Sequence, residues 1–360
     1  MKNTYKILIS GYYGFDNFGD DAILYVILDS LKSTIPNAEI VVISNDPEKI
    51  KELYGVASVY RFDLKGIFSV MRYSDLFISG GGSLLQDVTS IKSLIYYLFL
   101  IFLAKISRTK SCIYAQGIGP IKSMPGKILA KLIISGVNLI TVRDEKSHEF
   151  LKQLGINSTI TADPVWGIKA SKSSHQIEDN NKIKVGIQLR SWFSLDDKKL
   201  EALADSICET FNPQEYSLIL FLLQDSLDLE ITRKLEKLIK YKHQDQDIKL
   251  VSNLSINDSL SLIASLDFLI AMRFHAELVA LKYKIPTFAL SYDPKVEILS
   301  KDAGIPYISI ENIDKNTLNE KFKEFILNKE SYISKLETFS SKKEQEAGQN
   351  IDLLVKYIVR

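Results

Sequence analysis

The chain has 360 residues, which is long for one compact domain and suits two, each large enough to bury a core. Hydrophobic residues make up 46% of it and charged residues 25%, a globular composition that argues against disorder or a fibrous class. Its 45 basic and 44 acidic residues give a net charge of +1, which argues against a nucleic-acid partner bound through phosphate neutralisation. Cys112 and Cys208 belong to no CxxC or Cys/His cluster, so we expect no metal site and a reducing compartment.

Two apolar runs near the start bear on location. The first, YKILIS, is short and ends in a glycine turn rather than a small-residue cleavage site, so we expect no signal peptide and a cytoplasmic protein. The second, SLIYYLFLIFLA at residues 93–104, is too short to span a bilayer, which takes about 20 residues. We expect a buried core helix there, with a helix that touches the inner face of the membrane as the alternative. Charges placed at Leu98 and Ile101 would test that contact.

Strand-like runs alternate with helical stretches in both halves of the chain. In order they are KILIS, EIVVIS, DLFISGGG, SCIYAQG, LITVRD and STITAD, then KVGIQLR, YSLILFLLQ, IKLVS, FLIAMR and TFALS. Such alternation predicts α/β domains, each with a parallel sheet between helices. The polar stretch between the two halves indicates a linker. We therefore expect domains at 1–168 and 184–340, a linker at 169–183, and a C-terminal helix at 341–360 that packs back on the first domain.

Ligands of open α/β sheets bind beyond the carboxyl ends of the strands, so residues that directly follow strands are the candidates for chemistry. The first such turn lies in GYYGFDNFGDDAIL, whose glycines fit neither GxGxxG nor a Walker loop. Asp20 and Asp21 at the helix start already satisfy the first N–H groups and the helix dipole, so a phosphate would compete with them. The turn is either a capped helix start or a site where Asn17 and Asp20 bind sugar hydroxyls.

The second turn, ISGGGSLLQD, places a run of glycines after a strand and Ser83 at an expected helix N-cap. With no carboxylate in its first turn, this segment could accept an anion or let a ligand approach the backbone closely. Gly81 and Gly82 are therefore candidates for binding an anionic donor. Gln86, in the same segment, is a candidate for binding an acceptor.

Two arginines follow strands, Arg143 in TVRDEKS and Arg190 in GIQLRSW. The planar guanidinium group suits bidentate binding of carboxylate and phosphate, although each arginine could equally belong to a structural ion pair. Asp144 and Glu145 beside Arg143 favour the structural interpretation there.

The segment AMRFHAELVALKYKIPTFALSYDPK indicates a reaction site more strongly than any other. Arg273 and His275 lie between a strand and a short helix, and histidine exchanges protons near neutral pH. A cation beside it could hold an anionic donor. The alternative for His275 is a helix-starting residue satisfied by the backbone.

Taken together, these segments resemble the polysaccharide pyruvyl transferase family, in particular the cell-wall polymer pyruvyl transferases of Gram-positive-type bacteria. The matching features run in order from residue 5 to about residue 296. They are YYGFDNFGDDAIL, ISGGGSLLQD, YAQGIGP, VRDEKS, TADP, the strand-end Arg190, and RFHAELVALKYKIPTFALSYDPKV.

The resemblance implies two Rossmann-like domains facing a cleft, similar to B-type glycosyltransferases, with the acceptor side in the first domain and the donor side in the second. It implies phosphoenolpyruvate as co-substrate, without a cofactor or metal. The product would be a pyruvate ketal on two hydroxyls of a sugar, such as N-acetylmannosamine or another N-acetylhexosamine. That sugar would belong to a cell-wall or exopolysaccharide precursor, which the family suggests is lipid-linked.

The resemblance also implies roles for residues. The Arg273-Phe274-His275 unit matches the donor-binding and catalytic segment, with His275 exchanging protons. Arg143 and Arg190 are both candidates for a further arginine at the donor. The chain has Gly19-Asp20-Asp21 where Gly-Asp-Glu is expected, so only a role that needs the reach of glutamate is in doubt.

Two other functions fit the same pattern. A nucleotide-sugar-dependent glycosyltransferase of the B-type fold is the nearer alternative, because fold does not determine function. It predicts a nucleoside diphosphate site in the second domain. A non-enzymatic protein that binds polysaccharide or a lipid intermediate is the other, and it gives no purpose to clustered arginine and histidine after strands.

Overall fold

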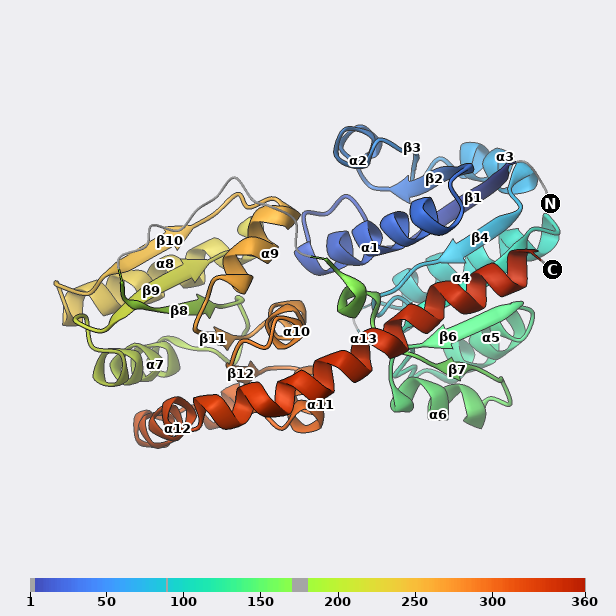
Figure 1. Ribbon diagram of the computed structural model, residues 1–360. Coiled ribbons are helices and arrows are strands. Elements are labelled where there is room, and N and C mark those ends of the chain that lie inside the picture. The colour runs from blue at the N-terminus through green and yellow to red at the C-terminus, as the bar shows by residue number, and fades with distance from the viewer. Residues whose placement is uncertain (1–3, 89, 170–180, 360) are drawn as a thin grey trace. The chain divides into compact units, whose positions relative to one another are not determined.

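The computed structural model describes residues 4–88, 90–169 and 181–359, and it divides into two compact units (Figure 1). The first unit comprises Met1–Ile168 and Lys343–Arg360, and the second comprises Lys169–Lys342. The expected class is confirmed, because each unit is a parallel sheet with helices on both faces. Most of the expected linker at 169–183 lies outside the described residues, and the second sheet already begins at Ile183.

The first unit is built on a seven-stranded sheet of order β3-β2-β1-β4-β5-β6-β7. Its elements are β1 (Tyr5–Ser10), α1 (Phe18–Thr34), β2 (Ala38–Ser44), α2 (Pro47–Tyr54), β3 (Ala57–Tyr60), α3 (Leu64–Tyr73), β4 (Leu76–Ser79), α4 (Ile91–Ile106), β5 (Lys110–Gln116), α5 (Met124–Ile134), β6 (Leu139–Val142), α6 (Glu145–Gln153), β7 (Thr159–Ile160) and the 3₁₀ helix η1 (Pro164–Gly167). Helices α3, α4, α5 and α6 bury their apolar faces in one core against one face of this sheet.

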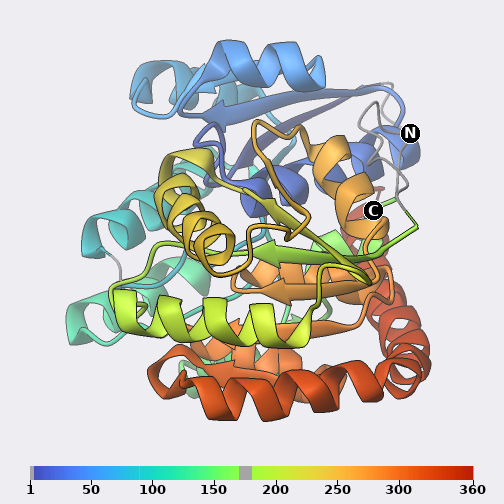
Figure 2. The same ribbon diagram turned by 90° about the vertical axis from the view of Figure 1, so that its left-hand side faces the viewer.

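The second unit is built on a six-stranded sheet of order β10-β9-β8-β11-β12-β13. Its elements are β8 (Ile183–Gln188), α7 (Asp197–Thr210), β9 (Tyr216–Phe221), α8 (Asp225–Lys242), β10 (Ile248–Val251), α9 (Ile256–Ala264), β11 (Phe268–Ala271), α10 (Phe274–Lys282), β12 (Thr287–Ser291), α11 (Pro294–Ala303), β13 (Tyr307–Ser309), η2 (Ile310–Asn312) and α12 (Lys315–Leu327). Helices α7 and α12 pack side by side, and with α8 they form one core against the sheet (Figures 1 and 2).

The last helix, α13 (Lys329–Val359), belongs to both units, because the division falls after Lys342. It therefore starts twelve residues before the helix expected at 341–360. Asn350 fastens its C-terminal part to the first unit. The Thr161 hydroxyl donates to Asn350 Oδ1 at 2.8 Å, and Asn350 Nδ2 donates to the Ala162 carbonyl at 3.0 Å.

All strands expected from the sequence are present, and β3 and β13 were missed. Both are short edge strands whose residues are largely half-buried or exposed, so they lack the continuous apolar run that marks an inner parallel strand. The helix start expected at Ser83 is wrong. The chain after β4 stays irregular until α4, because Leu85 and Asp87 bond to the segment after β5. The Leu85 carbonyl accepts from Gly119 N, and the Asp87 carboxylate accepts from the N–H groups of Lys122 and Ser123.

Candidate functional site

Strand order reverses once in each sheet, and the candidate residues follow the strands at these two points. In the first sheet β1 and β4 are neighbours, and the turns after them carry Asn17 and the glycine run. In the second sheet β8 and β11 are neighbours, and Arg190 and His275 follow them. Each unit thus presents its candidates where an open α/β sheet binds ligands.

Arg273 follows β11 and precedes the first residue of α10. Its N–H donates to Gln188 Oε1 at 2.8 Å, which ties it to the end of β8. Its guanidinium donates from Nε and Nη2 to the two oxygens of Asp228, both at 2.7 Å, and from Nη2 to Gln224 Oε1 at 3.0 Å. Arg273 is 7% exposed and Asp228 is 0% exposed. The guanidinium is therefore held rigidly, and one carboxylate already offsets its charge.

Arg190 is the second cation at this edge. Its Nη1 donates to the hydroxyl of Tyr292 at 2.8 Å, and its guanidinium carbon lies 5.3 Å from the ring centre of Trp192 and 5.1 Å from that of Tyr292. These partners are neutral. Burial raises the pKa of Asp228, and the guanidinium groups of Arg273 and Arg190 both oppose that rise. Two guanidinium groups therefore act on one carboxylate, which leaves one positive charge in excess.

His275 lies in the first turn of α10, half-buried, with its ring 5.1 Å from that of Phe274. Lys295 Nζ lies 5.8 Å from the centre of the Phe274 ring. No side chain caps the start of α10, so the positive end of its dipole also faces this edge. We call the set Arg190, Arg273, His275 and the start of α10 the cationic edge. It suits a ligand with more than one anionic group.

Glu277 is a buried carboxyl group in the first turn of α10. It is 0% exposed, and Ser300 Oγ donates to its Oε1 at 2.6 Å. Burial raises the pKa of its carboxyl group well above 4.5, which favours the protonated, uncharged form.

In the first unit, the turn after β1 is organised by its own side chains. Asn17 caps α1, because its Oδ1 accepts from Gly19 N at 3.2 Å and its Nδ2 donates to Asp20 Oδ2 at 2.6 Å. Burial raises the pKa of Asp21 to about 7, an effect that Lys49 opposes and Asp16 adds to. The turn after β1 is thus a capped helix start, one of the two alternatives expected from the sequence. Asp20 adds a carboxylate at this edge of the first sheet.

The glycine run after β4 is explained by packing. An added Cβ at Gly81 would lie 2.9 Å from Ile23 Cγ2 of α1. Gly82 has φ +91°, and an added Cβ there would lie 3.1 Å from Asp20 Oδ1. Gln86 is turned to its own segment, where its Oε1 accepts from Val88 N at 2.7 Å. These residues shape the edge of the first sheet.

Arg143 and Arg190, the two candidates for a further arginine at the donor, have different surroundings in the structure. Arg143 Nη1 donates to Asp163 Oδ2 at 2.6 Å and Nη2 to Ser83 Oγ at 2.8 Å, and its Nε lies 3.8 Å from Asp144 Oδ2. Its side chain is 6% exposed. Arg143 therefore ties together the first unit, whereas Arg190 shares the second sheet's edge with Arg273.

The sequence profile of the polysaccharide pyruvyl transferase family matches residues 17–294 of the chain. The chain belongs to this family. The match begins at Asn17 and ends within α11, so it includes the polar residues of both edges and excludes α12 and α13. No curated protein matches the chain in sequence.

Solved structures of other proteins share the fold. A protein of Listeria monocytogenes assigned as a UDP-N-acetylglucosamine 2-epimerase superposes with a TM-score of 0.74 at 11% identity, over 98% of this chain and 96% of its own. HepE of Anabaena, in complex with UDP and glucose, gives 0.63 at 14% identity over 99% of each chain. A glycosyltransferase of Rickettsia africae gives 0.64 at 12% over 100% of each. These likenesses establish a fold like that of B-type glycosyltransferases.

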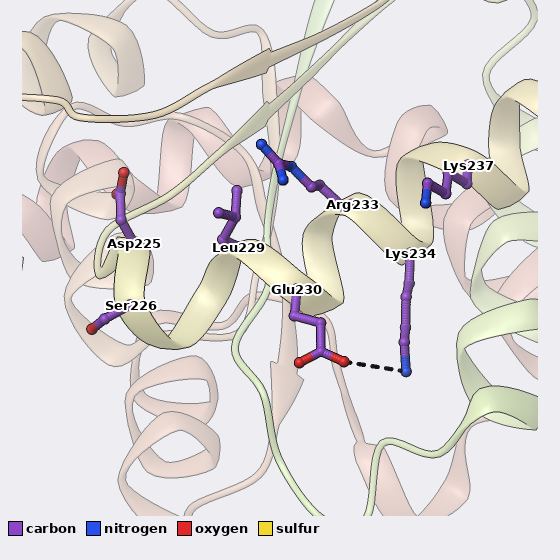
Figure 3. Close-up of a pocket in the computed structure, with 7 residues that line it drawn as sticks. All are labelled: Asp225, Ser226, Leu229, Glu230, Arg233, Lys234 and Lys237. Carbon is purple, nitrogen blue, oxygen red and sulfur yellow. Dashed lines mark ion pairs between the residues drawn. The ribbon is translucent and has the colours of Figure 1, made fainter.

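A hollow of about 470 Å³ lies elsewhere, on the outer side of α8 (Figure 3). It is lined by Asp225, Ser226, Leu229, Glu230, Arg233, Lys234 and Lys237. Lys234 Nζ lies 3.7 Å from Glu230 Oε1, so part of the positive charge in this hollow is paired. All the lining residues belong to α8 and none to the cationic edge. We therefore do not include this hollow in the candidate site. Across the described ranges, no three His, Cys, Asp or Glu side chains gather as a metal site.

Sequence reasoning missed an aromatic group in the first unit. The rings of Tyr12 and Phe15 stack at 4.0 Å, and the Arg61 guanidinium carbon lies 5.1 Å from Phe15, 4.9 Å from Phe62 and 4.8 Å from Tyr96. Tyr12 and Phe62 are exposed. The aromatic spacing of YYGF in the first turn was the available signal. In the second unit Asp228 was missed because its helix carries no distinctive pattern.

Proposed function

We propose that the protein transfers the pyruvyl group of phosphoenolpyruvate to two hydroxyls of one sugar and so forms a pyruvate ketal. The observation that supports this most is the cationic edge, because the donor carries both a carboxylate and a phosphate. Arg190 and the start of α10 bind these anions, and Arg273 lines the site with its position fixed by Asp228. Family membership supports the class of reaction.

The reaction balances with the donor and two hydroxyls alone. A proton adds to the methylene carbon of phosphoenolpyruvate, which becomes a methyl group, and a sugar hydroxyl attacks the adjacent carbon and loses its proton. The C–O bond to phosphate then breaks, and phosphate leaves with the electron pair. The second hydroxyl attacks the same carbon, loses its proton and closes the ketal. We assign the proton exchange to His275, a contribution of about 10²–10⁴-fold in rate.

The acceptor contacts in this proposal come from the first unit. Asn17, Asp20 and Gln86 are the polar candidates, and Gly81 and Gly82 shape the backbone beside them. The stacked Tyr12 and Phe15 add an apolar surface against which a sugar ring packs. We propose an N-acetylhexosamine of a cell-wall or exopolysaccharide precursor, such as N-acetylmannosamine, as the acceptor.

The test is to incubate the protein with phosphoenolpyruvate and a panel of soluble and lipid-linked N-acetylhexosamine disaccharides. One acceptor should gain the mass of a pyruvyl ketal as one phosphate is released. His275→Gln should lower the rate about 10²-fold or more. His243→Gln, a half-buried histidine at the end of α8, is the matched control and should keep full activity. Binding of nucleotide sugars without binding of phosphoenolpyruvate would instead favour the glycosyltransferase alternative.

A further inference from the structure

The charge of the chain is balanced overall but not locally. From Val88 to Arg143 the sequence contains no aspartate or glutamate. The basic residues of this stretch are Lys92, Lys105, Arg108, Lys110, Lys122, Lys127, Lys131 and Arg143. The stretch includes both α4 and α5, so each of these helices has lysines and no acidic residue.

Both helices also expose large apolar side chains in a stripe. On α4 the stripe consists of Ile91 (45% exposed), Ile95 (49%), Phe102 (43%) and Ile106 (53%). Their spacings of four, seven and four residues place them on one side of the helix. On α5 it consists of Met124 (66%), Ile128 (56%) and Leu132 (66%), spaced by four. The opposite sides of both helices are buried in the core of the first unit.

The two stripes lie on neighbouring helices of one layer (Figure 1). An added Cβ at Gly126 of α5 would lie 3.3 Å from Leu94 of α4, and one at Gly136 just after α5 would lie 3.1 Å from Lys105 Nζ. The helices are thus parallel and adjacent at both ends. Because both bury their other side in the same core, the two stripes face outward together.

Lysines border these stripes. On the helical period, Lys92 and Lys105 flank the α4 stripe on either side, and Lys127 and Lys131 run along one side of the α5 stripe. Within the part of the chain that the structure describes, none of the four forms an ion pair with a carboxylate. Their charges therefore remain available to a partner.

We propose that the exposed sides of α4 and α5 dock on the surface of an anionic lipid bilayer. The apolar stripes would enter the headgroup region, and the lysines would meet lipid phosphates with their stems along the apolar surface. The contact lies on the surface, because no helix among the described residues is long and apolar enough to cross a membrane.

The lysines that border the stripes favour a bilayer over a second copy of the chain as the partner of this surface. A symmetric interface would set this lysine-bordered surface against itself and bring like charges together without a carboxylate to pair them. The core helix expected at residues 93–104 is confirmed, because α4 buries most of these side chains. The two positions named from the sequence as a test of membrane contact belong to that buried side. Leu98 is 0% exposed and Ile101 is 2% exposed, so charges there would disrupt the core. The proposed contact is the outer side of α4 together with α5. It does not depend on the proposed function.

The experiment is co-sedimentation of the full chain with phosphatidylcholine vesicles, with and without phosphatidylglycerol. The wild type should bind the anionic vesicles and lose binding as salt is raised. Ile128→Glu/Leu132→Glu should weaken binding about tenfold or more, because it removes apolar contact and adds two repelled charges. Leu327→Glu is the matched control, since Leu327 is 84% exposed on α12 in the second unit, and it should bind as the wild type does.

Circular dichroism and thermal unfolding establish that the variants are folded, which these exposed positions favour. Equal binding of the α5 variant and the wild type would overturn the proposal, as would absence of wild-type binding to anionic vesicles. So would a dimer in sedimentation velocity that Ile128→Glu/Leu132→Glu dissociates while vesicle binding is absent, because that result would assign the surface to a second copy.

Discussion

Replacing Asp228 by Asn should strongly destabilise the second unit. The carboxylate is 0% exposed and accepts two hydrogen bonds of 2.7 Å from Arg273, which is itself 7% exposed. Asparagine keeps one acceptor and turns an amide donor toward the guanidinium, so a buried cation loses its counter-charge. Breaking a buried ion pair in this way costs about 3–5 kcal/mol, against a total of about 5–15 kcal/mol for a typical domain.

The assay is denaturant unfolding at neutral pH, with tryptophan fluorescence as the probe. The chain has two tryptophans, so a Trp166→Phe background shared by all variants leaves Trp192 to report on the second unit. Asp228→Asn/Arg273→Gln should be more stable than Asp228→Asn alone, because the second change removes the stranded charge. Added phosphate should stabilise Asp228→Asn more than the shared background, since two guanidinium groups then face the edge without a carboxylate.

Two results would contradict a buried, coupled Arg273–Asp228 pair. Asp228→Asn within about 1 kcal/mol of the background would mean that the pair is not buried as described. A double variant whose loss equals the sum of the two single losses would mean that the two side chains are not coupled.

Further predictions concern the first unit, and denaturant unfolding checks each of them. Asp21→Asn should become more stable relative to the wild type between pH 3.8 and about pH 7, by about 4 kcal/mol, because the unfolded carboxyl group loses its proton before the folded one does. A wild type that gains stability over Asp21→Asn in that window would contradict this. Leu98→Ala should cost about 2–5 kcal/mol and Leu132→Ala under about 0.5 kcal/mol, since their exposures are 0% and 66%. Equal losses of stability in these two variants would contradict the burial pattern. Gly81→Ala should lower the free energy of unfolding by about 1–3 kcal/mol, because the added Cβ would crowd Ile23. An unchanged free energy of unfolding would show that the Ile23 side chain moves aside without cost.

The inner strands of both sheets could be predicted because each is a continuous apolar run followed by a glycine or polar turn. Two of the four edge strands could not, since Ala57–Tyr60 and Tyr307–Ser309 are only partly buried and carry no such run. Ser83 gave a false helix start. The sequence shows a good N-cap residue there, but the Asp87 carboxylate is used by backbone N–H groups 35 and 36 residues away, which no local pattern reveals.

The positions of Arg190, Arg273 and His275 could be predicted from the rule that ligands bind after parallel strands. Their partners could not. The Arg273–Asp228 pair spans 45 residues and the Arg190–Tyr292 bond spans 102, so both depend on the packing of separate elements. The same holds for Arg143, whose bond to Asp163 spans 20 residues.

The binding of phosphoenolpyruvate at the cationic edge is tested most directly by calorimetric titration of this donor into the wild type, Arg190→Gln and Arg233→Gln. Arg233 is exposed on the outer side of α8, outside the cationic edge, and serves as the matched control. We expect the wild type and Arg233→Gln to bind with equal affinity. Arg190→Gln should bind about 10–100-fold more weakly, as expected for the loss of a charge-assisted hydrogen bond. Equal binding by all three proteins, or no binding by the wild type, would contradict the assignment of the donor to this edge.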